Sequence, residues 1–105
     1  MVRFNVLYPR RVGARFDTDY FVNRHLPLLH ELLLPMGLAG IQAHAGDAGG
    51  PGPASAYLMV ASLDFASLDD LRRAMSVHGA TIADEAGRFT DIEPLVQVGS
   101  EVFRA

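Results

Sequence analysis

The segment from Ala56 to Phe65 constrains the fold of this chain more than any other. Successive residues of an extended strand point to opposite faces, and both faces of this segment are mostly apolar. One face carries Tyr57, Met59, Ala61 and Leu63, and the other carries Leu58 and Val60. Because apolar side chains are stabilised by removal from water, each face needs a covering layer. The sequence therefore predicts a central strand in a layered fold.

The other segments predict an α+β fold around this strand. Alternating apolar residues indicate three more strands, which span Val2–Tyr8, Leu38–Ala45 and Leu95–Phe103. Apolar residues recur at threes and fours in two predicted helices, one from the N-cap Asp17 to the stop at Pro35 and Gly37, the other from the N-cap Ser67 to Ala86. The order β-α-β-β-α-β is the ferredoxin-like plan. Right-handed crossovers then place both helices on one face of a four-stranded antiparallel sheet.

The second face of such a sheet has no cover within one chain. The predicted strand over 56–65 carries apolar residues on that face too, so we expect it to be buried. The simplest cover is the same face of a second copy. We therefore expect a homodimer whose two sheets stack into a dimeric α+β barrel.

The composition disfavours several classes of protein. With 105 residues, the chain is expected to form one domain over 1–105. It has no cysteine, which removes disulfides and thiolate chemistry and favours the cytoplasm. The net charge of -3 and the scattered arginines lack the clustered basic face that nucleic acid requires. The N-terminal residues lack a signal-peptide apolar region, and polar residues interrupt the run Leu26–Leu34. We expect a soluble cytoplasmic protein with no nucleic-acid or membrane partner.

The segment Gly46–Ser55 is rich in glycine and proline. It fits neither the dinucleotide-binding nor the P-loop pattern, and its prolines lack the N–H groups that cradle phosphate. A strand, not a helix, is predicted to follow it. The sequence predicts a mobile connection between two strands and no nucleotide site.

A histidine lies in the apolar stripe of the first predicted helix. At 100° per residue, His25 falls in the middle of a face formed by Phe21, Leu28, Leu29, Leu32 and Met36. Pro27 has no N–H to donate to the carbonyl of Asn23, so we expect the helix to kink or restart there. A kink beside an inward imidazole would leave an unpaired acceptor and some space. The sequence thus predicts a pocket at His25.

The candidate catalytic residues are His25 and His78, which lies on the apolar face of the second helix. Packing in the core is the alternative role for both. The candidate ligand-binding residues carry polar groups or share the stripe: Asn5, Tyr8, Tyr20, Phe21 and Tyr57. Alternation alone does not settle which face each strand residue occupies. Asp91 is expected to anchor a loop, and no metal site is predicted.

The chain resembles the EthD family, named for ethyl tert-butyl ether degradation. The resemblance runs nearly end to end through shared elements: Leu7-Tyr8-Pro9, Phe16-Asp17 with Tyr20, His25-Leu26-Pro27, the Gly/Pro loop before Tyr57, His78, and Thr90-Asp91-Ile92-Glu93-Pro94. It implies a homodimeric α+β barrel that acts in the degradation of small organic compounds, with oxidoreductase activity as a common assignment.

Three functions are compatible with these residues. The leading hypothesis is an EthD-like catabolic protein without a cofactor, which binds a small apolar organic molecule and uses His25 as proton acceptor and His78 as a second polar contact. A second hypothesis places haem in the pocket with one of the two histidines as axial ligand. A third is a binding protein without chemistry.

Overall fold

The computed structural model describes residues 1–47 and 54–105, so the predicted connection at Gly46–Ser55 lies largely outside the described residues. The strands are β1 (Val2–Pro9), β2 (Leu38–Ala45), β3 (Tyr57–Phe65) and β4 (Leu95–Ser100). The helical segments are α1 (Thr18–Tyr20), η1 (Phe21–His25), α2 (Leu26–Leu33), η2 (Leu34–Met36) and α3 (Leu68–Ala86). Within the described residues, no helix combines the length and apolar character needed to cross a bilayer.

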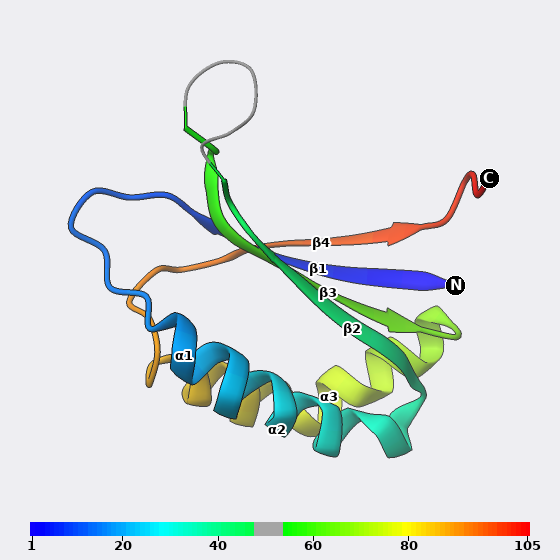
Figure 1. The fold of residues 1–105 in the computed structure, drawn as a ribbon. Coiled ribbons are helices and arrows are strands. Elements are labelled where there is room, and N and C mark those ends of the chain that lie inside the picture. Colours follow the sequence, from blue (N-terminus) through cyan, green and yellow to red (C-terminus); the bar gives the residue numbers. More distant parts are fainter. Residues whose placement is uncertain (48–53) are drawn as a thin grey trace.

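The four strands form one sheet in the order β2-β3-β1-β4, and all three neighbouring pairs are antiparallel. The helical segments pack on one face of this sheet (Figure 1). This arrangement confirms the predicted ferredoxin-like βαββαβ fold. The predicted central strand also has its expected place, since β3 pairs with β1 on one side and β2 on the other.

Strand β4 ends at Ser100, so the predicted end at Phe103 was wrong. The cause is the length of its partner. Register pairs Ser100 with Val2, the first residue of β1, and beyond it only the N–H of Glu101 donates to the carbonyl of Met1, at 3.4 Å. A strand continues only while a neighbour offers backbone groups to pair with. Residues 101–105 are exposed and lie outside regular structure.

The first helix restarts next to Pro27, as predicted. Asp17 caps its N-terminus by accepting a hydrogen bond from the Tyr20 N–H at 3.0 Å. A π-helical turn, η1, follows, in which the N–H of Leu26 donates to the carbonyl of Phe21, five residues earlier. The α-helical pattern then resumes with Pro27 in the first turn of α2, where a missing N–H is tolerated. Single π turns of this kind are frequent at functional sites.

Two turn residues confirm predictions made from their chemistry. Gly37 ends the helical segment with φ of 97°, in the left-handed region that favours glycine. Asp91 anchors the loop before β4, because its Oδ1 accepts the Arg15 N–H at 2.9 Å and pairs with Arg11 at 3.1 Å. The backbone hydrogen bond from Arg15 is the main reason that the pKa of Asp91 is lowered.

The core between helices and sheet has two clusters of buried side chains. One joins α2, α3 and the sheet through Leu29, Leu33, Leu38, Leu63, Phe65, Leu71 and Ala74. Three aromatic residues belong to the other, which contains Tyr8, Phe21, Met59, Ala61, Phe89 and Ile92. Its rings meet edge to face, with Tyr8 and Phe21 centroids 5.9 Å apart and Tyr8 and Phe89 centroids also 5.9 Å apart. Tyr8, Phe21, Ala61, Leu29 and Leu63 also border the cavity described below.

Two glycines should respond to alanine in opposite directions. A Cβ at Gly37 would lie 2.7 Å from the Asp70 Oδ2 and would be strained by the positive φ, so Gly37→Ala should destabilise the fold by more than ~1 kcal/mol. A Cβ at Gly79, inside α3, would meet nothing closer than 4.0 Å. Gly79→Ala should therefore stabilise by up to about 1 kcal/mol through helix propensity. Urea unfolding measures both changes, and a shift of the same sign in both variants would contradict this account.

Candidate functional site

A cavity of about 190 Å³ lies between the helices and the sheet. Its wall is formed by Phe4, Val6, Tyr8, Phe21, His25, Leu26, Leu29, Ala61, Leu63, Met75, Gly79, Ile82, Ala83, Ala86, Pro94 and Val96. The space arises because small residues from both layers line it: Ala61 on β3, and Gly79, Ala83 and Ala86 on α3. In this wall, only His25 and Tyr8 have side chains with nitrogen or oxygen atoms. The site is therefore an apolar pocket with two polar groups.

Among the described residues, His25 has a buried side-chain nitrogen, Nδ1, that lacks a hydrogen-bond partner. The residue is 3% exposed, and its ring lies 5.7 Å from the ring of Phe21 and 4.5 Å from that of Phe89. Its buried Nδ1 makes no hydrogen bond and lies 3.9 Å from the Oε1 of Glu85. Burial lowers the pKa of the ring, and the charge of Glu85 opposes this only in part. At neutral pH the imidazole is thus uncharged and has a lone pair to offer.

Glu85 lies behind His25 and is itself held by two side chains. Its Oε1 accepts the hydroxyl of Tyr20 at 2.8 Å, and its Oε2 lies 3.2 Å from the Nε of Arg88. The hydrogen bond to Glu85 is the main reason that the pKa of Tyr20 is raised. Sequence reasoning missed Glu85. The available signal was its position three residues after Ile82, where a carboxylate shares the apolar face of the second helix.

Tyr8 is the second polar side chain of the cavity. Its residue is 3% exposed, and burial raises the pKa of its hydroxyl to about 12. The phenol therefore stays protonated at any physiological pH and can donate a hydrogen bond. Phe21 also lines the cavity and packs against His25. Three predicted site residues, Tyr8, Phe21 and His25, thus share one wall.

The other predicted site residues lie elsewhere. Tyr20 reaches the site only through Glu85. His78 is half-buried on α3 and does not line the cavity, because α3 presents Gly79, one position or about 100° further round, to it. Tyr57 lies at the start of β3, outside the lining. Asn5 points to the opposite face of the sheet, where its Oδ1 accepts the hydroxyl of Ser62 at 2.8 Å.

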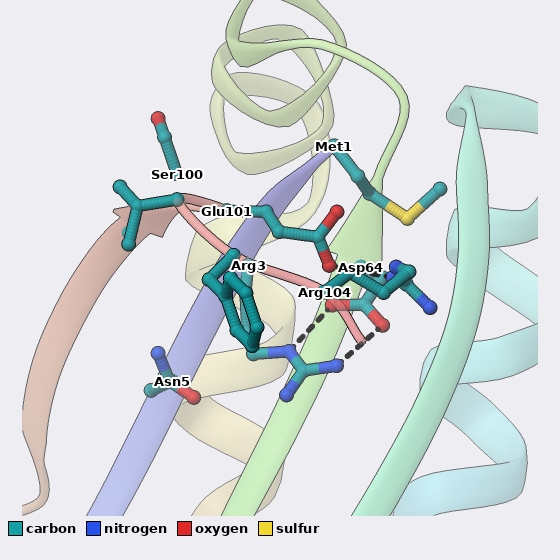
Figure 2. A pocket seen from close by; sticks show the side chains of 10 residues that line it. Met1, Arg3, Asn5, Asp64, Ser100, Glu101 and Arg104 are labelled. Atoms are coloured by element: carbon teal, nitrogen blue, oxygen red, sulfur yellow. Dashed lines mark hydrogen bonds and ion pairs between the residues drawn. The ribbon is translucent and has the colours of Figure 1, made fainter.

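The face of the sheet that carries Asn5 has its own basin of about 310 Å³, next to the C-terminal residues. Arg3 donates two hydrogen bonds to the carboxylate of Asp64 in this basin (Figure 2), and the donor–acceptor distances are 2.8 and 3.0 Å. Glu101 and Arg104 form a second ion pair, at 2.6 Å. These four charged side chains of the basin are therefore paired with each other, whereas His25, in the wall of the smaller cavity, has a buried nitrogen without a hydrogen bond.

The cavity does not fit haem. Pockets for drug-sized ligands occupy about 300–1,000 Å³, and a haem macrocycle is at the large end of such ligands. The space beside His25 is about 190 Å³, and the second histidine lies outside it. A single ring fits this volume. Among residues 1–47 and 54–105, no three potential metal ligands gather as a metal site would require.

Solved structures resemble this chain over nearly its whole length. An EthD-like protein from Ralstonia eutropha JMP134 is 31% identical, with a TM-score of 0.89, and the match covers 99% of this chain and 94% of that one. An EthD family protein from Bacillus halodurans C-125 is 21% identical, with a TM-score of 0.67 and coverage of 97% and 99%. An Arabidopsis thaliana protein is 11% identical, with a TM-score of 0.72 and coverage of 100% and 99%. The last two share the fold. No protein-family model and no curated protein matches the sequence.

The lowered pKa of His25 should make stability depend on pH. The unfolded ring binds a proton near pH 6.5, while the buried ring does so only at lower pH. The free energy of unfolding should therefore be highest above pH 6.5 and fall as pH drops through the folded pKa. Urea unfolding between pH 7.5 and 5 measures this loss, which should shrink in His25→Phe and persist in the exposed-site control His30→Gln. Equal losses in all three proteins would show that His25 titrates normally.

Proposed function

The chain belongs to the EthD family, and on this premise we propose that it binds a small, largely apolar organic molecule beside His25 and acts in the degradation of such compounds. One observation carries the proposal: a neutral, buried imidazole without a hydrogen bond on Nδ1 stands in the wall of an otherwise apolar cavity. A buried polar group left unpaired costs about 1–3 kcal/mol. Because Glu85 Oε1 lies 3.9 Å from Nδ1, the second ring nitrogen, Nε2, is the one left to accept a proton or a hydrogen bond from a ligand.

The volume of the cavity defines the class of ligand. An engineered protein cavity of about 150 Å³ with an apolar wall stays dry and binds benzene. A cavity of about 190 Å³ has room for one ring with a short substituent. The two polar groups of the wall add a chemical requirement, since His25 accepts a proton or hydrogen bond and Tyr8 donates one. A substituted phenol satisfies both conditions.

We propose that His25 acts as the proton acceptor for this ligand. Its pKa is lowered by burial, so the ring is neutral at pH 7 and able to take a proton from an acidic O–H group. An oxidoreductase role would involve His25 through this proton transfer only, because imidazole does not exchange electrons. The absence of His78 from the cavity favours one competing role, a binding protein in which His25 only orients the ligand.

The ligand hypothesis can be tested with a matched pair of compounds. 4-Methylphenol and 4-methylanisole have similar shapes, but only the phenol has a proton to give. We expect the phenol to bind more tightly by calorimetry, and at a hundred times its dissociation constant to stabilise the protein by ~2.7 kcal/mol in a thermal melt.

His25→Phe should abolish this stabilisation while the melting temperature stays equal to or above that of the wild type, since the cavity has room for the larger ring and a half-satisfied polar group is removed. His30→Gln, an exposed change on the same helix, serves as control and should bind as the wild type does. If His25→Phe unfolds the protein while the ligand shift of the remaining folded fraction is unchanged, His25 is structural.

We also propose that the protein is a homodimer formed through the bare face of the sheet. The supporting observation is that Val60 of β3 and its register partner Leu7 of β1 lie one position from Met59 and Tyr8, which face the helices, and so belong to the opposite face of the sheet. On β4, Leu95 continues this face and is 55% exposed. Apolar surface at the centre of a sheet is typical of a contact between copies.

Charge on this face should dissociate the dimer. Light scattering of the wild type should give twice the mass of the chain at micromolar concentration, and Val60→Glu should shift it toward the single-chain mass, because each copy would bury an unpaired carboxylate. Val77→Glu is the matched control, since Val77 is 60% exposed on α3, away from this face. A wild type that is monomeric at these concentrations would disprove the dimer.

A further inference from the structure

We propose that Glu85 is a positioning residue, which holds neutral His25 with its proton on Nδ1 and so leaves Nε2 as the nitrogen that accepts a proton from the ligand. The tautomer is assigned for the protein without ligand, so it can be tested without one. The ligand step rests on the proposed function.

The carboxylate of Glu85 is held by two side chains besides His25. Tyr20, at the end of α1, donates its hydroxyl to Oε1 at 2.8 Å, and Arg88, just after α3, pairs with Oε2 at 3.2 Å. The side chain of Glu85 is only 13% exposed, whereas that of Arg88 is 71% exposed. The carboxylate is therefore held in place between a surface arginine and the buried ring of His25.

The position of Oε1 selects between the two tautomers of His25. Oε1 lies 3.9 Å from Nδ1. A lone pair on Nδ1 would face a negative oxygen at this distance, while an N–H at Nδ1 would point its positive end toward it. Both effects are strong because the local dielectric constant of a buried site is low. The hydroxyl of Tyr20 already donates its proton to Glu85. A proton between Nδ1 and Oε1 therefore has to come from the imidazole ring.

A distance of 3.9 Å is longer than a hydrogen bond. Catalytic contacts are often long in a free protein and shorten when the ligand binds. The π turn that carries His25 ends at this residue, and its ring stacks on Phe21 with an interplanar angle of 21°. We expect a small movement of the His25 ring on ligand binding to bring Nδ1 within hydrogen-bond distance of Oε1.

The proposed step transfers one proton from the ligand to His25. The O–H bond of the ligand breaks, an N–H bond forms at Nε2, and the electron pair stays on the ligand oxygen as an oxyanion. No oxidant or reductant takes part. The imidazolium that results lies beside the carboxylate of Glu85, which compensates its charge, as a carboxylate does for a catalytic histidine in hydrolases.

Nitrogen NMR measures the tautomer directly. In protein with ¹⁵N-labelled histidine at pH 7.5, and without ligand, the long-range ¹H–¹⁵N spectrum distinguishes a protonated from an unprotonated ring nitrogen. His25→Phe identifies the signals of His25 among the four histidines of the chain. We expect Nδ1 to be protonated and Nε2 unprotonated. A spectrum with the proton on Nε2 would overturn the inference.

Three variants link the tautomer to Glu85. Glu85→Gln removes the charge with little change in shape and should populate both tautomers. Tyr20→Phe removes one anchor of the carboxylate and should give a smaller shift in the same direction, which keeps the test valid should Glu85→Gln be poorly folded. Glu93→Gln removes the same charge from an exposed site and should leave the spectrum unchanged. An unaltered tautomer in both Glu85→Gln and Tyr20→Phe would overturn the role of Glu85.

Ligand binding separates this inference from the proposed function. The wild type should prefer 4-methylphenol over 4-methylanisole by about tenfold, and Glu85→Gln should lose most of that preference while its affinity for the anisole is unchanged. Equal loss of affinity for both compounds would indicate a damaged cavity and would overturn the positioning role. Failure of the wild type to bind either compound, together with a protonated Nδ1, would refute the proposed function and leave the tautomer assignment standing.

Discussion

Burial of β3 is the constraint on which the rest of the structure depends. This strand pairs with two neighbours, and the side that carries Met59, Ala61, Leu63 and Phe65 has to be covered by helices. Large side chains fill most of the space between the two layers. An unfilled volume remains beside Ala61, because the residues of α3 that face it are small. The cavity is thus a local shortfall in packing volume between two layers that are otherwise close-packed. His25 lines this space from the end of η1.

Most of the fold could be predicted because the signals involved are local. Alternation located the strands, and side chains that bond to nearby backbone groups marked the helix starts, as Asp17 and Ser67 show. Gly37 and Pro27 change the helix through their own backbone geometry. Their effects could therefore be predicted without knowledge of any residue that packs against them. The end of β4 was different, since it depends on the length of β1.

The site could be predicted only in part, because its contacts join distant segments. The helical periodicity placed His25 on the inward face of its helix. It did not identify Glu85, which is sixty residues away in sequence and approaches the ring only through the packing of α3. The same packing decides that Gly79, not His78, faces the cavity. Asn5 illustrates a further limit: alternation separates two faces of a strand but does not say which of them the helices will cover.

The π turn at Phe21–His25 has a consequence for how such sites can change in evolution. A π turn holds one residue more than an α turn, so it is equivalent to an insertion that the helix has absorbed. Deletion of Val22, Asn23 or Arg24 would give a regular α-helical turn and leave the segments on either side close to their present orientation, because the turn has one residue to spare. Every residue of the cavity would remain in the chain, yet Phe21 and His25 would be three positions apart instead of four, which would change how their rings stack. The geometry of this site is therefore encoded in the number of residues in the turn as well as in their identity.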